Sequence, residues 1–243
     1  MAADGTEFIG LIIPGGWEEF FRFIGEPYAG PLYPTDDKRN PMEVLVPKLI
    51  AATEKFDMIP KRDHKGAEAP QPWSEADHVL PTGNEPYYLK SNQGPKYAAG
   101  GLLVRPMATD DQSNAKFNIG KIEGSNLFKE TVFSQTKSLC FEKAHHGFYV
   151  EDGKMNFKID DVEAEVSAGE TIFVPAGSSF SFEITSRYAT SYVFSNGGGI
   201  VEMLRALEGQ ASEPYMQKAE GAVHNKEKWQ NVQNRLKLRA VPA

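Results

Sequence analysis

FYVEDGKMNFKI (residues 148–159) and AGETIFVPAGSSFSFEI (residues 168–184) are two neighbouring stretches that decide the fold of this chain. Each contains a run in which apolar and polar residues alternate, MNFKI in the first and FSFEI in the second. Because successive side chains of a β-strand point to opposite faces, the alternation predicts two strands with one apolar face each. The residues predicted to face inward are Met155, Phe157, Ile159, Phe180, Phe182 and Ile184. The sequence therefore predicts strands around a strongly apolar interior.

Short β-prone runs with turn signals between them extend on both sides of these stretches. Many short strands at regular spacing are typical of a sandwich or barrel of the jelly-roll kind. The predicted strands span residues 87–89, 101–106, 116–123, 128–133, 138–142, 147–150, 154–159, 162–166, 171–174, 180–184 and 190–194. Two helices are predicted after the last strand, at residues 199–207 and 226–238. The predicted fold class is mainly β, a single jelly-roll barrel with an N-terminal helical extension and a C-terminal helix.

The N-terminal region has a different pattern from the β-prone runs. Residues 6–13 are predicted as a short strand, which a Pro-Gly-Gly turn ends. WEEFFRFI, from Trp17 to Ile24, has helical spacing of its aromatic residues. Asn40 followed by Pro41 is typical of a helix start, and Pro47 is expected to end or kink the first part of that helix.

A polar, proline-dotted stretch at residues 61–85 separates this region from the β-prone runs. Such a composition is typical of a linker or a long wrapping loop. It predicts three parts of the chain: an N-terminal strand and helix extension with its linker at residues 1–85, the barrel at residues 86–212 and a helical tail at residues 213–243.

The composition argues against several classes of function. The 243 residues carry a formal net charge of −7, and no cluster of Lys and Arg offers a phosphate-binding surface, so we expect no nucleic-acid partner. No apolar run approaches the roughly 20 residues that cross a bilayer, and the N-terminus lacks signal-peptide features. We therefore expect a cytoplasmic protein without a membrane partner. Cys140 is the single cysteine, which leaves no intramolecular disulfide and predicts a small core residue.

The two stretches quoted first resemble the two sequence motifs of the cupin superfamily. The second motif has the form G-D-x-x-x-x-P-x-G-x-x-H, and GETIFVPAGSSF at residues 169–180 keeps its glycines and its proline. Two further segments, GLIIPGGWEEFFRFIGEPY and YYLKSNQGPKY, are similar to the inter-domain segment and C-terminal half of fungal quercetin 2,3-dioxygenase-like bicupins. The resemblance covers nearly the whole chain, but the N-terminal barrel of those proteins is absent. Residues 6–13 would be the last strand of that barrel.

The resemblance implies a metal site that this chain keeps only in part. The metal-binding barrel of the family uses two His and one Glu from its first motif and one His from its second, because a divalent metal needs convergent N and O ligands. By resemblance, His146 stands in place of the Glu, and Phe180 stands in place of the second-motif His. Depending on which of the family's two spacings applies, the positions of the His pair are Leu139 and Phe141, or Cys140 and Glu142.

These departures leave few possible ligands. At best Cys140, Glu142 and His146 converge, and at worst only His146 remains. Fungal quercetinases carry their metal in the N-terminal barrel and none in the C-terminal one, which is the barrel that this chain resembles. A Phe in place of a ligand removes an imidazole that nothing nearby replaces. The resemblance therefore disfavours a metal-dependent dioxygenase, and no cofactor is expected.

Two adjacent histidines precede the aromatic strand of the first motif. Alternation along that strand turns His146 and Phe148 to one face, and His145 and Tyr149 to the other. If His146 faces the interior, it is either a buried imidazole hydrogen-bonded to backbone or hydroxyl, or a general acid or base in an apolar cavity. Glu142 is either a solvated residue or the carboxylate that orients this imidazole.

Other polar residues are candidates for substrate contacts. Arg105 lies in a predicted strand that would line the barrel, where it either forms a rim salt bridge or binds a phenolate, enolate or carboxylate. Tyrosines inside the barrel would recognise the hydroxyl groups of an aromatic ligand. The predicted catalytic residues are His146, Glu142, Arg105 and Tyr149. The predicted substrate-binding residues are Phe148, Met155, Phe157, Phe180, Phe182, Tyr192, Lys96 and His145.

The sequence thus favours a metal-independent cupin enzyme that acts on an aromatic, flavonoid-like or polyketide-like small molecule, in secondary metabolism. The expected chemistry is proton transfer by an isomerase, cyclase or lyase, for example a chalcone-to-flavanone type cyclisation. Two alternatives stay open, a dioxygenase with a divergent metal site and a non-catalytic binding protein. We also expect a homodimer that exchanges the N-terminal segment, because an isolated strand has unpaired edges.

Overall fold

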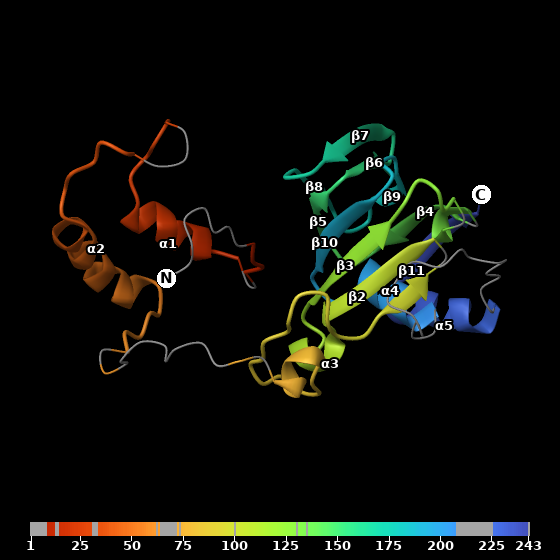
Figure 1. The fold of residues 1–243 in the computed structure, drawn as a ribbon, viewed down its shortest axis with the longest axis horizontal. Coiled ribbons are helices and arrows are strands. Elements are labelled where there is room, and N and C mark those ends of the chain that lie inside the picture. Colours follow the sequence, from red (N-terminus) through yellow and green to blue (C-terminus); the bar gives the residue numbers. More distant parts are fainter. Residues whose placement is uncertain are drawn as a thin grey trace. The chain divides into compact units, whose positions relative to one another are not determined.

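The computed structural model divides the chain into two units, residues 1–71 and residues 72–243. In Figure 1 the first unit runs from red to orange and the second from yellow to blue. Among the described residues, strands occur only in the second unit. The described residues are 9–12, 15–30, 34–61, 63, 72, 74–99, 101–129, 131–134, 136–207 and 226–242.

The first unit contains two helices, α1 (Trp17–Ile24) and α2 (Pro41–Lys55), which contact each other. Both helices are confirmed at their predicted starts. The Asn40 side chain accepts a hydrogen bond from the Met42 N–H at 3.0 Å, which is the expected N-cap. However, α2 continues through Pro47. Of the two expected effects, an end of the helix is therefore wrong, and a kink stays a prediction. Proline removes a single backbone hydrogen bond there, which the helix tolerates.

The described part of the predicted N-terminal strand is not a strand. Residues 9–12 form no regular secondary structure, and the rest of residues 6–13 lies outside the described residues. Among the described residues of this unit, the buried hydrophobic side chains are Phe20 and Ala52. Phe20 packs edge-on against Phe56, with ring centroids 5.6 Å apart. The first unit therefore has little hydrophobic core of its own.

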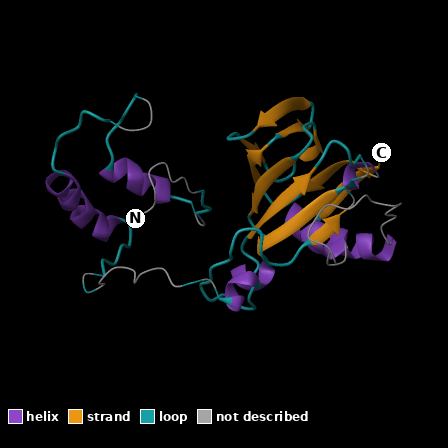
Figure 2. Ribbon diagram, in the orientation of Figure 1, coloured by secondary structure: helices purple, strands orange, loops and turns teal. Residues whose placement is uncertain are grey.

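The second unit is a barrel of two antiparallel sheets, drawn in orange in Figure 2. Its strands are β1 (Tyr97–Ala99), β2 (Leu102–Ala108), β3 (Asn118–Gly124), β4 (Thr136–Phe141), β5 (His146–Asp152), β6 (Lys154–Ile159), β7 (Val162–Ser167), β8 (Thr171–Val174), β9 (Ser179–Ile184), β10 (Ala189–Ser195) and β11 (Leu238–Pro242). The six-stranded sheet has the order β1-β2-β3-β10-β5-β8, and the five-stranded sheet has the order β11-β4-β9-β6-β7. This arrangement confirms the predicted mainly β, jelly-roll fold.

Short helices accompany the two sheets. They are the 3-10 turns η1 (Glu75–His78) and η2 (Val132–Ser134) and the helices α3 (Asp110–Ser113), α4 (Ile200–Leu207) and α5 (Lys226–Leu236). α4 contacts β1, β2, β3 and α5, and its apolar residues belong to the core of the barrel. Within the described residues, no helix has both the length and the apolar character that crossing a membrane would require.

Some predicted strands differ from the observed ones. Residues 87–89 form no strand, and the described part of residues 128–133 contains only η2 and irregular chain. The last predicted helix stops at Leu236 instead of residue 238, because Lys237 takes a left-handed conformation with φ 49°. The chain then forms β11, which pairs with β4. The C-terminal segment therefore completes the five-stranded sheet, an outcome that depends on pairing between residues far apart in sequence.

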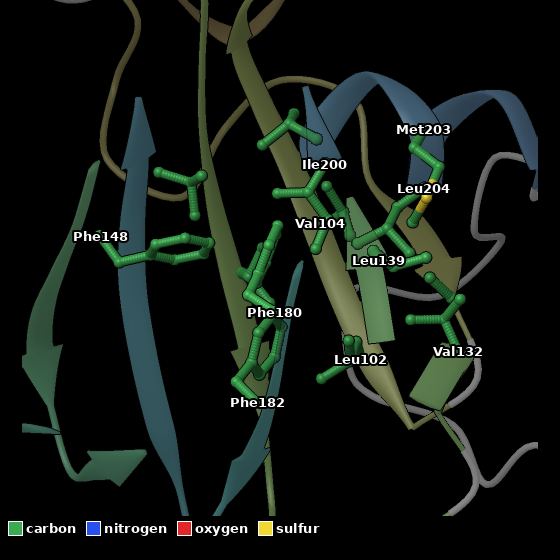
Figure 3. Packing of buried hydrophobic residues seen from close by; sticks show 14 of the residues in the cluster. Leu102, Val104, Val132, Leu139, Phe148, Phe180, Phe182, Ile200, Met203 and Leu204 are labelled. Atoms are coloured by element: carbon green, nitrogen blue, oxygen red, sulfur yellow. The ribbon is translucent and has the colours of Figure 1, made fainter. Parts of the chain in front are cut away.

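The core lies between the two sheets, where the alternation of MNFKI and FSFEI placed it. The six side chains predicted to face inward are all in the core cluster or packed against it. Figure 3 shows Phe180 and Phe182 pointing into this cluster from β9, with Phe148 entering from β5. Full burial of such an aromatic side chain stabilises the fold by about 1.5–3 kcal/mol. The apolar interior is thus confirmed.

The turn between β5 and β6 requires the glycine of the first motif. Gly153 has φ 74°, a conformation that L side chains rarely adopt. A Cβ at this position would also lie 2.1 Å from the backbone carbonyl oxygen of Tyr188. Both the backbone conformation and the space therefore demand glycine where the motif has it.

Candidate functional site

The two possible positions of the family's His pair lie on opposite faces of β4. Leu139 and Phe141 are buried and belong to the core cluster. Cys140 and Glu142 face the other way, as alternation requires. The guanidinium of Arg239 contacts both of them: Nη2 donates to Cys140 Sγ at 3.3 Å, and Nε lies 3.1 Å from Glu142 Oε1. The inward pair is therefore Leu139 and Phe141, neither of which can bind a metal.

Three of the inward positions of the family's ligand set, Phe141, His146 and Phe180, meet at one end of the barrel, where their rings pack together. His146 on β5 has ring-centroid distances of 4.7 Å to Phe141 and 5.4 Å to Phe180. Phe148 stacks on the same imidazole at 6.2 Å. We call these four side chains the aromatic cluster, and all four are buried. The structure thus brings Phe141 and Phe180, two positions that the resemblance names, into contact with His146, and side-chain packing fills the space between them.

His146 also connects the barrel to α4. Its Nε2 accepts a hydrogen bond from the backbone N–H of Ile200 at 3.1 Å, which is one of the N–H groups that a helix start leaves unpaired. Gly199 makes this approach possible, since a Cβ there would lie 2.5 Å from Nε2. An accepting Nε2 places the imidazole proton on Nδ1. Within the described residues, Nδ1 has no hydrogen-bond partner.

The surroundings of His146 keep its imidazole neutral. Burial and, to a smaller extent, the neighbouring His145 lower its pKa from 6.5 to about 3. The backbone of Ala144 acts in the opposite direction, although its geometry falls short of a hydrogen bond. Desolvation dominates because a low-dielectric environment disfavours the charged imidazolium. At neutral pH His146 is therefore an uncharged residue with one accepting and one donating nitrogen.

The donor set at this end of the barrel does not fit a divalent metal. Such an ion needs several convergent N, O or S ligands, and the inward positions offer one imidazole, that of His146, among carbon-only side chains. Cys140 and Glu142 do not converge with it, which corrects the expected best case. In the part of the chain that the structure describes, no three His, Cys, Asp or Glu side chains are placed to hold a metal ion.

His145 lies on the opposite face of the same strand end. Its exposed imidazole stacks on Phe173 with ring centroids 5.6 Å apart and an interplanar angle of 13°. Its Nδ1 accepts a hydrogen bond from the Ala176 N–H at 3.0 Å. The predicted alternation of the two histidines is thus confirmed, and His145 is not brought to the interior with the other predicted substrate-binding residues.

Arg105 lies on the outer face of β2, opposite to its core-facing neighbours. It forms a buried ion pair with Glu123 and donates to the Asn92 carbonyl oxygen at 3.1 Å. The Tyr188 hydroxyl donates to Glu123 Oε2 at 3.3 Å, and burial together with the Glu123 charge raises the pKa of Tyr188 to about 12. The structure corrects the expectation that Arg105 lines the barrel. Its geometry is that of a salt bridge outside the interior.

The remaining predicted site residues divide between the two faces. Tyr149 and Tyr192 are paired across β5 and β10 on the outer face and are partly buried. The Lys121 ammonium lies 4.4 Å from the centroid of the Tyr192 ring. Lys96 precedes β1 and is partly buried. The predicted residues that face the interior together are Phe148, Met155, Phe157, Phe180 and Phe182.

A pocket of about 150 Å³ lies at the other end of the barrel. The strand register separates the two ends: His146 pairs with Ser195 of β10, whereas Ala189, at the opposite end of β10, pairs with Gly124. Gly124 in turn pairs with Leu102, which lines the pocket. Figure 3 shows the same separation within the core, because Leu102 lies at its lower end and Ile200, the partner of His146, at its upper end.

The pocket contains residues that the sequence did not single out. Its lining is formed by the ends of β2 and β9 and by the connection between β3 and β4, which the sequence pattern predicts as a strand. Phe182 is the one predicted site residue among the described residues that line it. The signal that points to this pocket is the pair Phe128 and Phe133, the two aromatic residues of this connection.

Two curated relatives are similar to this chain, and no protein-family model matches it. The quercetin 2,3-dioxygenase of Aspergillus japonicus is 26% identical over 211 residues, which is 79% of this chain and 59% of the relative. The quercetin 2,3-dioxygenase of Bacillus subtilis (strain 168) is 24% identical over 132 residues, which is 54% of this chain and 37% of the relative. The chain thus spans less than two thirds of either relative.

Solved structures match part of this chain at low scores. A predicted oxalate decarboxylase of Thermotoga maritima covers 43% of this chain and 92% of its own, with 15% identity and a TM-score of 0.35. An RmlC-like cupin of Shewanella frigidimarina NCIMB 400 covers 44% of this chain and 86% of its own, with 14% identity and a TM-score of 0.34. Scores of this size do not bear on the function. In its sequence and in the two-sheet barrel built on both motifs, the chain is similar to quercetinase-like proteins of the cupin superfamily.

Proposed function

We propose that this chain is a non-catalytic, quercetinase-like cupin that binds a small aromatic molecule. The observation that carries this proposal is the aromatic cluster. Carbon-only side chains stand at the inward ligand positions other than that of His146, which is 1% exposed and has its Nε2 hydrogen-bonded to the start of α4. A general acid or base must come within hydrogen-bond reach of the reacting group, and this imidazole is closed off from solvent. The relatives support an aromatic ligand, since both are named quercetin 2,3-dioxygenase.

An acid–base isomerase, cyclase or lyase is the second candidate, and one observation favours it. Most buried polar atoms have a hydrogen-bond partner, yet Nδ1 of His146 has none among the described residues. In this candidate the Nδ1–H of the neutral imidazole donates a hydrogen bond to a substrate oxygen after the aromatic cluster opens, and it stabilises the negative charge that develops on that oxygen. His146 acts without the other predicted catalytic residues, because Glu142 is paired with Arg239 and Arg105 is paired outside the barrel.

A metal-dependent dioxygenase is the alternative that the names of the relatives suggest. For this alternative, the chain would need metal ligands from outside the aromatic cluster, since three of the four positions hold carbon-only side chains. The chain also spans 59% of the Aspergillus relative. The dioxygenase activity of that protein therefore carries over to this chain only as a hypothesis.

We also infer a homodimer in which the N-terminal unit covers a second copy of the chain. Exposed apolar side chains in this unit support the inference: Met42 is 68% exposed, Ile50 59% and Phe21 55%. A unit with so little core gains stability when a partner covers such residues. Light scattering of the full chain tests this, and a monomer at micromolar concentration would contradict it. The cytoplasmic location stays a prediction.

Turnover assays separate the three functions. The full chain, purified without chelator, is incubated with a flavonol and with a chalcone, each with and without added Fe²⁺, Cu²⁺, Ni²⁺ or Mn²⁺. The proposal predicts no conversion above that of the heat-unfolded protein. Flavonol oxidation that a chelator abolishes would establish the dioxygenase. Chalcone cyclisation that His146→Gln abolishes and His145→Gln retains would establish the acid–base enzyme, and either result contradicts a non-catalytic role.

A further inference from the structure

The pocket at the barrel end opposite to the aromatic cluster has the size of a single aromatic ring. Its volume is about 150 Å³. An engineered cavity of about 150 Å³ lined by Leu, Ile and Phe binds benzene, whereas sites for drug-sized ligands occupy about 300–1,000 Å³. The size of the pocket therefore favours one six-membered ring over a whole three-ring flavonol.

One side of the pocket is apolar and aromatic. Phe133 and Phe182 pack edge to face, with ring centroids 5.0 Å apart and an interplanar angle of 69°. Leu102 and Ile184 extend this apolar surface. Aromatic rings prefer offset or edge-to-face neighbours, so a ligand ring placed against this pair gains contacts of the same kind. The apolar side thus favours an aromatic ligand over a polar one such as a sugar.

Hydroxyl groups form the polar part of the same pocket, from Ser125, Thr131 and Ser134. Ser134 Oγ donates to the Lys129 carbonyl oxygen at 2.8 Å and accepts from the Thr131 N–H at 3.0 Å. A hydroxyl oxygen has two acceptor lone pairs, so one remains for a ligand. The Thr131 hydroxyl accepts from the Phe133 N–H at 3.2 Å, and its own proton has no acceptor among the described residues. The pocket can therefore both donate to and accept from a ligand hydroxyl.

The pocket is lined by one positive and one negative side chain, so these two residues give it no net charge. Lys129 and Glu183 both line it and both are exposed. A carboxylate ligand would meet one attractive and one repulsive charge in high dielectric, where each interaction is weak. These two charges therefore give a carboxylate ligand no net advantage in binding over a neutral ligand.

We propose that this pocket binds one neutral phenolic ring, either a monocyclic phenol or one ring of a larger phenolic molecule. The ring lies against Phe133 and Phe182, and its hydroxyl exchanges hydrogen bonds with the Thr131 and Ser134 hydroxyls. This inference rests on the proposed binding role, for which it names the place and the chemical class of the ligand. The site is separate from the positions where the cupin family holds its metal, because the strand register places the two at opposite barrel ends.

Methyl NMR of the full chain, labelled at Ile and Leu methyl groups, tests the inference with 4-methylphenol and toluene as probes. The two probes differ by one hydroxyl. We expect 4-methylphenol to shift the methyl signals of Ile184 and Leu102 with a dissociation constant on the order of 1 mM, a typical affinity for so small a ligand. We expect toluene to bind about fivefold more weakly, because it forms no hydrogen bond. The methyl signals of Ile200, at the other end, should not shift.

Variants assign the binding to individual side chains. Thr131→Val should reduce the preference for 4-methylphenol over toluene about twofold, because the hydrogen bond to Ser134 remains. Phe133→Ala should weaken the binding of both probes about tenfold. Phe173→Ala removes an exposed ring of β8 that does not line the pocket, and it should leave binding unchanged. If Phe133→Ala does not fold, Ser134→Phe replaces it. Residue 134 is exposed, so the new ring should fill the pocket without disturbing the core.

Each outcome bears on a different statement. Absence of shifts at Ile184 and Leu102, equal affinity for the two probes, or unchanged binding in Ser134→Phe would overturn the pocket inference. If no probe binds and the turnover assays are also negative, the pocket inference fails and the non-catalytic role stands. If the probes bind as expected and a flavonol or chalcone is converted, the pocket inference stands and the non-catalytic role fails.

Discussion

Replacing His146 by glutamine should remove a large part of the acid sensitivity of the fold. In the folded chain burial holds the pKa of His146 near 3, compared with an unperturbed 6.5. The unfolded chain therefore binds a proton at this residue between these two pH values, and the folded chain does not. Because the folded-state pKa is lowered, the contribution to stability is complete above the unfolded-state pKa and is lost as the pH falls. Glutamine does not titrate, so this loss disappears in the variant.

The magnitude follows from the two pKa values. One proton bound only by the unfolded state lowers the free energy of unfolding by about 1.4 kcal/mol for each pH unit below about 6.5, so the loss from about pH 7 to about pH 5 is about 2 kcal/mol. The glutamine amide oxygen can still accept from the Ile200 N–H, which keeps the start of α4 satisfied. His145→Gln is the matched control, because its imidazole is exposed.

Urea unfolding of the three proteins at the two pH values measures this effect. The wild type and His145→Gln should lose about 2 kcal/mol more than His146→Gln on acidification. Carboxylates that titrate in the same range affect all three proteins equally and cancel in the comparison. If His146→Gln loses as much stability as the wild type, His146 is not buried in its neutral form, and the packing argument for the aromatic cluster is refuted.

Further stability predictions use matched pairs of variants and the same urea measurement. Gly153→Ala should destabilise the chain more than Gly169→Ala, although both glycines have positive φ. A Cβ at residue 153 would lie 2.1 Å from a carbonyl oxygen, whereas a Cβ at residue 169 would meet nothing within 4 Å. Equal losses of stability in the two variants would contradict the predicted crowding at residue 153. Arg105→Met should cost roughly 3 kcal/mol because it leaves the Glu123 carboxylate buried without its ion-pair partner. Lys158→Met, in an exposed ion pair, should have little effect; a similar loss in both variants would refute the placement of Arg105.

The fold could be predicted where local patterns are strong. MNFKI and FSFEI give the inward faces, the alternation around His146 gives the strand face that it shares with Phe148, and Asn40 with Pro41 gives the start of α2. These features depend on neighbours in the sequence, so a single sequence reveals them. The strand β11 cannot be predicted in this way, because it forms only by pairing with β4, about a hundred residues away in the sequence.

The candidate site could be predicted only in part. The resemblance to the cupin motifs indicates which positions converge, and the structure brings Phe141, His146 and Phe180 together. The resemblance does not reveal which hydrogen-bond and ion-pair partners the polar residues have. Arg105 has no local sign that its strand face is the outer one, since both faces of β2 are buried. Likewise, the sequence around Glu202, a buried residue of α4, does not indicate its ion-pair partner Arg235. Arg235 belongs to α5, and its Nη1 lies 2.8 Å from Glu202 Oε1.

The most direct test of the central claim is the metal content of the full chain after incubation with Fe²⁺, Cu²⁺, Ni²⁺ or Mn²⁺ and removal of free metal by gel filtration. The aromatic cluster offers one neutral imidazole among carbon-only side chains, and a divalent metal needs several convergent ligands. We therefore predict that the wild type and His146→Gln retain the same trace of metal, far below one ion per chain. Stoichiometric metal in the wild type that His146→Gln loses would contradict the claim that packing has replaced the metal site.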